Sequence, residues 1–316
     1  MIVKKPDFWD LKRPNLLAYL LLPFTLIVKI NNFFLGSKKK ILNRNIKSIC
    51  IGNIYLGGTG KTPSTIKIYK ILKKIETNTV IGKKFYNNQV DEIKLLQKEC
   101  KILTHKKRSE ILKKAQNQNK KIIIFDDGLQ DNAISYNLKI VCFDGKKLIG
   151  NGLLLPSGPL REHISNLKSY DCLLFKDANT KINNFTRLAK SINKKLKIFF
   201  TYTQIKNLKE FNKKNKYLIF SGIGNSDSFK NLLIKNKFNI VKEIIFPDHF
   251  NYKSEQIEEI KKLSKKLQAK ILTTEKDFLR INKNYKKNID FVKIDLIFKN
   301  EKNFVKYLKF KIYEKN

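Results

Sequence analysis

The chain has 316 residues, a length that favours two domains rather than one. It carries 66 Lys and Arg residues against 27 Asp and Glu residues, a formal net charge of +39. Hydrophobic residues make up 42% of the chain and aromatic residues 11%, which is enough for a packed core and excludes a disordered polybasic tail. The four cysteines have neither a paired nor a zinc-binding spacing, which indicates a reducing compartment.

The excess of basic residues consists almost entirely of lysine. A protein that reads nucleic acid uses arginine more often, because its planar fork matches phosphates and guanine edges. Lysine enrichment together with abundant Asn and Ile is typical of an AT-rich genome, with an anionic membrane surface or nucleic acid as the alternative explanation. The six arginines are Arg13, Arg44, Arg108, Arg161, Arg187 and Arg280.

The first predicted element is the apolar segment Asn15–Leu35. Its uninterrupted part, Leu16 to Val28, has about 13 residues, whereas a membrane-spanning helix needs about 20. A buried core helix, an interfacial anchor and a single span are all possible, and we favour the interfacial anchor. Lys38, Lys39 and Lys40 follow, and the positive-inside rule then keeps the rest of the chain cytosolic.

Short apolar runs then alternate with amphipathic stretches, which predicts βα units and mostly parallel sheets. The predicted strands are Ile46–Ile51, Thr79–Ile81, Lys121–Phe125, Lys139–Phe143, Cys172–Phe175, Ile198–Tyr202, Tyr217–Ser221, Ile240–Phe246, Ala269–Thr273 and Phe291–Ile294. The predicted helices are Ser64–Ile75, Asp91–Cys100, Arg108–Asn117, Asp227–Lys235 and Ser254–Lys266. The Lys- and Asn-rich segment 177–195 separates two such sets and is the predicted domain boundary.

A glycine-rich loop with the sequence GNIYLGGTGKTP spans Gly52–Pro63, between a predicted strand and a predicted helix. This is the context of a phosphate-binding loop, in which backbone N–H groups and a helix N-terminus surround phosphate oxygens. Lys61 would reach the β- and γ-phosphates, and the Thr62 hydroxyl would bind Mg²⁺. Tyr55 stands where the strict pattern has glycine, and Gly57 and Gly58 can supply the flexibility instead.

Two carboxylates, Asp126 and Asp127, end the apolar strand that follows. A strand that ends in this way is the usual Mg²⁺-holding partner of a phosphate loop, although Asp-Gly at a strand end also fits a simple turn. Neighbouring side chains on a strand point to opposite faces, so the two carboxylates should not bind one metal ion through regular strand geometry.

Five motifs in order resemble the tetraacyldisaccharide 4'-kinase family. They are GNIYLGGTGKTP, FDDGLQD at 125–131, GNGLLLPSGPLRE at 150–162, FPDH at 246–249 followed by Tyr252, and TTEKD at 273–277. The resemblance implies an α/β fold of the P-loop NTPase type with a mostly parallel sheet flanked by helices, a second smaller α/β domain and an N-terminal membrane-associated helix. The corresponding domains are 1–35, 36–195 and 196–316.

The same resemblance implies that the enzyme phosphorylates the 4'-hydroxyl of lipid A disaccharide 1-phosphate with ATP and Mg²⁺. It places the nucleotide on Gly57, Gly58, Thr59, Gly60, Lys61 and Thr62, and the metal ion near Thr62, Asp126 and Asp127. It also implies that Asp91 and His249 activate the acceptor hydroxyl and that Arg161 lies near the transferring phosphate. Around Asp91 the family's Gly and Pro are replaced by Val90 and Ile93.

For such an enzyme we expect an anionic membrane surface as partner, on the cytoplasmic face of the inner membrane of a Gram-negative bacterium, and no specific nucleic acid. The sequence carries no indication of the oligomeric state. Two other functions stay open. One is a different phosphate-loop kinase or NTPase, acting on a soluble small molecule or as a regulatory GTPase, and the other is a basic membrane- or nucleic-acid-binding protein with a vestigial phosphate loop. Guanine recognition by Asn-Lys-x-Asp is absent, since residues 274–277 read TEKD.

Overall fold

The structure is a computed structural model that describes the chain except residues 1–4, 29, 31–44, 132, 179–181 and 314–316. The chain forms two compact units, and each is described by itself. The larger unit comprises Lys5–Phe85, Glu99–Tyr202 and Leu296–Asn316, and the smaller unit includes Tyr86–Lys98 and Thr203–Asp295. The unit boundaries therefore fall inside strands β7 (Lys197–Ile205) and β12 (Ile294–Phe298) and near the ends of helix α4 (Val90–Glu99).

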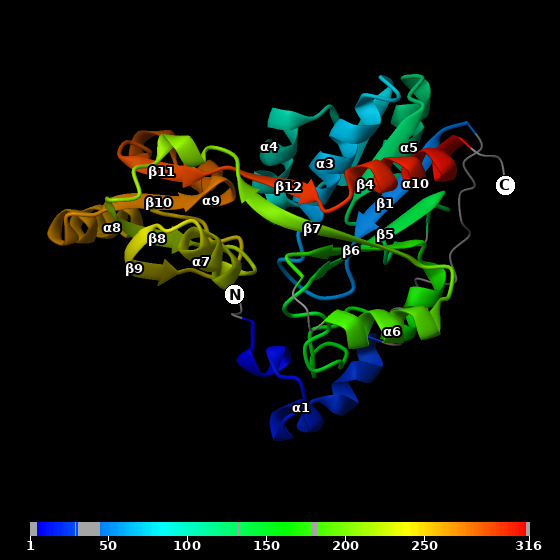
Figure 1. Cartoon of the computed structure of the whole chain (residues 1–316), viewed down its shortest axis with the longest axis horizontal. Helices are drawn as coiled ribbons and strands as arrows, with labels where there is room; N and C mark the ends of the chain where they lie inside the picture. The colour runs from blue at the N-terminus through cyan, green and yellow to red at the C-terminus, as the bar shows by residue number, and fades with distance from the viewer. Residues whose placement is uncertain (1–4, 29, 31–44, 132, 179–181, 314–316) are drawn as a thin grey trace. The chain divides into compact units, whose positions relative to one another are not determined.

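The larger unit contains most of an eight-stranded sheet in the order β12-β7-β6-β5-β1-β4-β2-β3 (Figure 1). All neighbours from β7 to β3 pair in parallel, as the alternation of strands and helices predicts. The strands are β1 (Lys47–Gly52), β2 (Thr79–Lys84), β3 (Ile102–His105), β4 (Ile122–Asp126), β5 (Leu138–Asp144), β6 (Cys172–Lys176), β7 (Lys197–Ile205) and β12 (Ile294–Phe298). The helices are α3 (Lys61–Lys73), α5 (Arg108–Asn117), α6 (Asn183–Ile192) and α10 (Glu301–Tyr313), while α4 (Val90–Glu99) lies almost wholly in the smaller unit.

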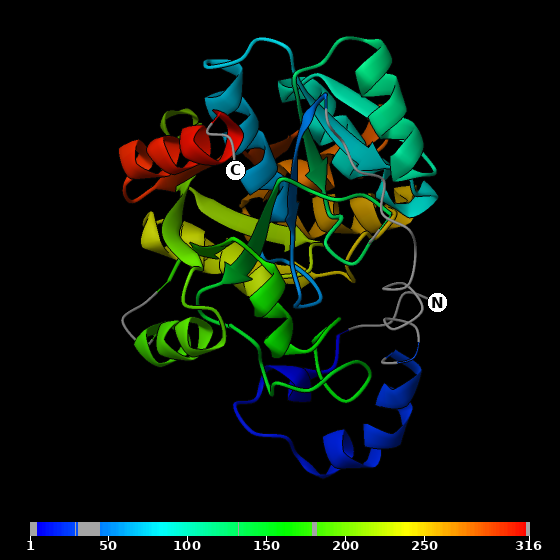
Figure 2. The ribbon, with the colours of Figure 1, turned by 90° about the vertical axis from the view of Figure 1, so that its right-hand side faces the viewer.

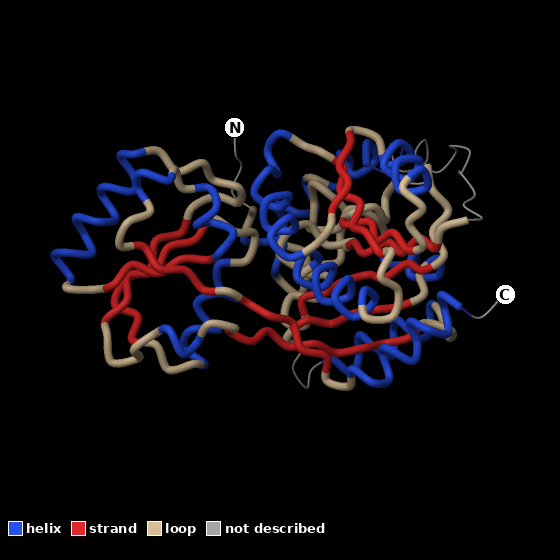
Figure 3. The backbone as a smooth tube through the Cα atoms, turned by 90° about the horizontal axis from the view of Figure 1, so that it is seen from above, coloured by secondary structure: helices blue, strands red, loops and turns tan. Residues whose placement is uncertain are grey.

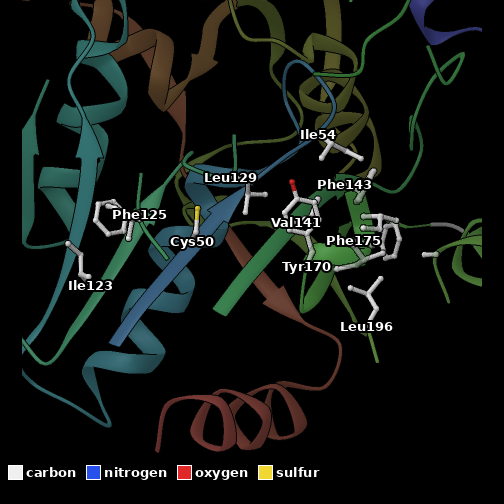
Figure 4. Close-up of a cluster of buried hydrophobic side chains, with 14 of the residues drawn as sticks. Cys50, Ile54, Ile123, Phe125, Leu129, Val141, Phe143, Tyr170, Phe175 and Leu196 are labelled. Atoms are coloured by element: carbon white, nitrogen blue, oxygen red, sulfur yellow. The ribbon is translucent and has the colours of Figure 1, made fainter. Parts of the chain in front are cut away.

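The core of the larger unit is built from the central strands, which are buried on both faces and therefore read as continuous apolar runs. Figure 4 shows part of this core, where Phe143 and Phe175 lie with ring centroids 5.7 Å apart. Cys50, Cys142 and Cys172 are free and buried in the strands, where they pack as small hydrophobic residues.

Segment 177–195, predicted as the domain boundary, falls within the range Glu99–Tyr202 of the larger unit. Helix α6 occupies much of it and places Phe185 and Ala189 in the core of the larger unit. Helix α10, which we expected in the C-terminal domain, also belongs to the larger unit, and its Tyr307 hydroxyl donates to the backbone of Asp171 at 3.2 Å. High local content of Lys and Asn therefore marked the exposed face of a helix rather than a linker.

The smaller unit has a four-stranded sheet in the order β11-β10-β8-β9, with all neighbours parallel. Side chains alternate along β8, so that Leu218 and Phe220 pack with α8 on one face, while Tyr217 and Ile219 pack with α7 on the other. Figure 3 shows these helices on the two sides of the strands. The elements are α7 (Ser226–Lys235), α8 (Ser254–Leu267), α9 (Glu275–Arg280), β8 (Lys216–Ser221), β9 (Asn239–Ile245), β10 (Lys270–Thr274) and β11 (Ile289–Val292).

The N-terminal segment docks on the larger unit through Trp9, whose ring N–H donates to the Pro156 carbonyl at 2.9 Å. It continues as α1 (Leu16–Leu20) and the 3-10 turn Leu22–Phe24, at the end of the unit opposite α10 (Figure 2). Leu16 is 76% exposed and Ile27 67% exposed, so a buried core helix is wrong here. Within the described ranges, no helix has the length and apolar character needed to cross a bilayer, and residues 31–35 and Lys38–Lys40 lie outside them.

Candidate functional site

The phosphate loop connects β1 to α3 in the larger unit. Gly57 and Gly60 have φ angles of +100° and +84°, which are left-handed values that favour glycine. Helix α3 begins at Lys61, directly after the loop, so its free N–H groups and the positive end of its dipole lie at the loop. The Thr59 hydroxyl is buried and has no hydrogen-bond partner among the residues that the structure describes. The loop therefore has both the conformation and an unsatisfied donor suited to an anionic ligand.

Tyr55, at the position where the strict motif has glycine, anchors this loop. Its side chain is 3% exposed and packs against Leu154 and Leu160. Its backbone forms an antiparallel bridge with Leu160, and its hydroxyl donates to Asp10. Tyr55 thus holds the first half of the loop against segment 154–160. Gly57 and Gly60 allow the second half to adopt its left-handed turns.

Lys61 points at two oxygen acceptors. Its ammonium group lies 2.8 Å from Asp127 Oδ2 and 2.9 Å from Asn53 Oδ1. Burial lowers the pKa of Lys61, and the Asp127 carboxylate opposes that shift. Sequence analysis did not single out Asn53, which is fully buried and lies inside the glycine-rich motif.

Asp127 follows β4 in a left-handed conformation, with a φ angle of +60°. Its carboxylate also receives a hydrogen bond from Arg161 Nη1 at 3.1 Å, so two cations converge on it. Burial alone would raise the pKa of Asp127, but Lys61 and Arg161 hold it well below its ordinary value. Arg108 donates to the backbone carbonyl of Asp127 and fixes this turn.

Asp126 has different partners from its neighbour, as the alternation of side chains predicts. It is 1% exposed and bonds through Oδ2 to the Lys83 ammonium at 2.7 Å and through Oδ1 to the Thr65 hydroxyl at 2.9 Å. Lys83 is itself 1% exposed, at the end of β2. Both oxygens of Asp126 are therefore engaged within the protein, and sequence analysis missed Lys83 because one lysine among 60 carries no signal.

Asp91 and His249 come together in the smaller unit. Asp91 lies in the first turn of α4, and its Oδ1 is 3.3 Å from His249 Nδ1. His249 has a φ angle of +58°, and its backbone N–H donates to the Gly222 carbonyl at 3.1 Å. A non-glycine residue held at positive φ carries a cost of about 1 kcal/mol or more, and such positions cluster at functional sites.

Two cations from α9 also reach Asp91. Arg280 donates to Asp91 Oδ2 at 2.7 Å through Nη2 and at 3.0 Å through Nε, and Lys276 lies 3.7 Å from the same oxygen. Burial raises the pKa of Asp91, but His249, Lys276 and Arg280 together lower it far below its ordinary value. Sequence analysis did not single out Arg280, although the scarcity of arginine could have marked it.

The predicted site residues thus form two groups, each within one unit. Lys61, Asp127 and Arg161 are in direct contact, and Thr62 is the second residue of α3. In the described part of the chain there is no cluster of three or more His, Cys, Asp or Glu residues that could hold a metal ion. The Asp127 carboxylate, in contact with Lys61 at the start of α3, fits Mg²⁺, which usually takes one or two carboxylates and completes its shell with water and substrate phosphates.

The phosphate loop lies between a parallel strand and a helix, and its lysine contacts a carboxylate at the end of a neighbouring strand. These features define a phosphotransferase of the P-loop class. The family model described as tetraacyldisaccharide-1-P 4'-kinase matches residues 14–313, and the chain belongs to this family.

Three reported relatives match between 88% and 100% of the chain. The tetraacyldisaccharide 4'-kinase of Pelagibacter ubique (strain HTCC1062) is 45% identical over 316 residues and covers 100% of both chains. That of Rickettsia felis is 33% identical over 295 residues, 88% of each chain. The crystal structure of LpxK from Aquifex aeolicus in complex with ATP superimposes with a TM-score of 0.70 at 21% identity, covering 94% of this chain and 100% of that one, and confirms the fold.

Proposed function

We propose that this protein is the kinase of lipid A biosynthesis that transfers the γ-phosphate of ATP to the 4'-hydroxyl of lipid A disaccharide 1-phosphate. Membership of the tetraacyldisaccharide 4'-kinase family supports this activity. The observation that carries the proposal is the convergence of Lys61 and Arg161 on Asp127 beside the phosphate loop. Phosphoryl transfer depends chiefly on such placement of charge, because the chemical step needs little covalent help from the protein.

In the larger unit we assign the loop residues 57–62 to the phosphates of ATP, with Lys61 neutralising their charge and Arg161 assisting at the transferred group. We assign Thr62 and Asp127 to Mg²⁺, which supplies further charge neutralisation when bound. Asp126 supports that site indirectly, since its side chain is fully buried against Lys83 and Thr65, whereas that of Asp127 is 20% exposed.

In the smaller unit we assign Asp91 and His249 to the acceptor hydroxyl. A sugar hydroxyl is weakly acidic, so its attack on phosphorus is helped by a group that accepts the proton as the new O–P bond forms. A carboxylate 3.3 Å from an imidazole nitrogen can hold that ring in one orientation and one tautomer.

We also propose that the N-terminal segment binds the membrane that holds the lipid substrate. Exposed leucine and isoleucine side chains on residues 16–30, together with the strong positive charge, suit the anionic cytoplasmic face of the inner membrane.

The proposed function is tested by incubating the purified chain in detergent with ATP, Mg²⁺ and lipid A disaccharide 1-phosphate. A 4'-phosphorylated product should form, and Lys61→Ala should reduce its rate by about 100-fold or more, because a large share of charge neutralisation is lost. Lys113→Ala, at an exposed lysine of α5, serves as the matched control. No product from the unmodified chain would overturn the assignment.

A further inference from the structure

We infer that Arg280 is a positioning residue of the acceptor-activating pair, acting through Asp91 to hold His249 in a productive orientation. The inference rests on the proposed function. Its structural basis is that one guanidinium group ties together three separate segments of the smaller unit, namely α4, the turn after β8 and α9.

The hydrogen bonds of Arg280 use most of its donors. Nη2 and Nε both bind Asp91 Oδ2, at 2.7 and 3.0 Å, while Nη1 binds the Gly222 carbonyl at 2.6 Å and Asp277 Oδ1 at 2.9 Å. The side chain of Arg280 is only 7% exposed, that of Asp91 5% and that of Asp277 fully buried. Charge-assisted hydrogen bonds among buried groups are strong and directional, so they hold the Asp91 carboxylate in one orientation.

The same guanidinium also fixes the position of His249. The Gly222 carbonyl that accepts from Arg280 also accepts from the His249 backbone N–H, at 3.1 Å. Arg280 Nη2 also lies 3.5 Å from His249 Nδ1, so Arg280 orients the imidazole through Asp91, through the Gly222 carbonyl and by this direct contact. The other charged groups around Asp91 are Lys276, Glu92, Asp248 and Asp277.

Lysine could replace this arrangement only in part. Its ammonium group is a single point charge, whereas the planar fork of arginine can bind acceptors in several fixed directions at once. In a chain that uses lysine at 60 of its 66 basic positions, an arginine at this place agrees with a requirement for the fork.

The test compares Arg280→Gln, Arg280→Lys and Arg187→Gln, an exposed arginine of α6, with the unmodified chain. For Arg280→Gln we expect kcat to fall by about 10-fold to 100-fold, since a misplaced catalytic pair costs rate in this range, with KM for ATP unchanged. Arg280→Lys should recover part of the loss and Arg187→Gln should have no effect. In an Asp91→Asn background, Arg280→Gln should change kcat by less than about 3-fold, because the two hydrogen bonds of Arg280 to Asp91 carry most of its effect.

A second readout does not depend on turnover. The chain has three histidines, so the ring resonances of His249 can be assigned by comparison with His249→Ala and followed by NMR. Arg280→Gln should shift the His249 signals and leave those of His105 and His163 in place. Unchanged His249 signals, or kcat losses that simply add in the double variant, would overturn the inference. Failure of the proposed function is distinct, since it appears as no product from the unmodified chain.

Discussion

Asp126 and Asp127 are neighbours in the sequence but serve different purposes in the structure. Asp127 lies beside the phosphate loop between Lys61 and Arg161, whereas Asp126 forms a buried ion pair with Lys83. A buried ion pair contributes little net stability compared with apolar packing, but the loss of one partner leaves the other charge uncompensated.

Removal of the Lys83 ammonium should therefore destabilise the larger unit strongly. We expect Lys83→Met to lower the free energy of unfolding by about 3 kcal/mol, because it leaves a buried carboxylate unpaired. Lys113→Met is the matched control, since it removes an exposed partner of Glu110 and should change stability by less than about 0.5 kcal/mol. The measurement is urea unfolding followed by the fluorescence of Trp9, the single tryptophan, which is buried on this unit. Equal effects of the two substitutions would contradict the prediction.

The lowered pKa of Asp127 predicts how the stability of the larger unit depends on pH. Because the folded state holds this carboxyl group ionised more firmly than the unfolded state does, its contribution is present at neutral pH and is lost as pH falls. The unmodified chain should exceed Asp127→Asn in stability at pH 7, and the difference should shrink below about pH 4 as the unfolded carboxyl group takes up a proton. Urea unfolding of both chains from pH 7 downward measures this difference, and a constant gap would refute the stated cause.

At the scale of elements, the N-terminal segment has a different environment from helix α3 of the same unit. Helix α3 buries Ile68 and Leu72 against the sheet, whereas α1 leaves Leu16 and Leu20 exposed. Single exposed apolar residues are ordinary, but a contiguous group of them marks an interaction surface.

Charges placed on that surface should release the protein from membranes. We expect the double variant Leu20→Glu, Ile27→Glu to lose binding to vesicles that contain anionic lipid, because burial of these side chains in the interface is replaced by burial of charge. Leu188→Glu, on the exposed face of α6, is the control and should still bind. Flotation of the protein with the vesicles is the measurement, and binding by the double variant equal to that of the control would exclude this surface as the anchor.

At the scale of the whole molecule, the two groups of site residues belong to different compact units. The phosphate loop with Lys61 lies in the larger unit, and Asp91 with His249 lies in the smaller one. Substitutions in the two groups should therefore affect different steps of the reaction.

We expect His249→Ala to leave the affinity for ATP within about 2-fold of the unmodified chain while kcat falls by about 100-fold, as removal of acid–base assistance usually causes. Lys61→Ala should instead weaken ATP binding as well as turnover. Equilibrium titration with ATP and steady-state kinetics separate the two effects. Loss of ATP affinity in His249→Ala would show that the assignment of roles to the two units is wrong.

The sequence alone predicted the architecture, because buried strands and amphipathic helices each have a characteristic spacing of apolar residues along the chain. Helix α5 was predicted from Arg108 to Asn117 as observed. The short, half-buried strand β3 was missed, and the predicted strand Phe291–Ile294 is divided between β11 and β12 of two different sheets. The phosphate loop was recognisable for the same local reason, since its conformation depends on glycines close together in the chain.

Only the tertiary structure decided which charged groups pair. Lys83 meets Asp126 across 43 positions, and Arg280 meets Asp91 across 189. No local pattern marks such partners, because an ion pair depends on distance in space and on burial, and a lysine-rich surface hides the few cations that are buried. The net charge of +39 comes mainly from lysines and describes the protein surface. The chemistry of the site depends instead on a few charged side chains that become buried when the chain folds.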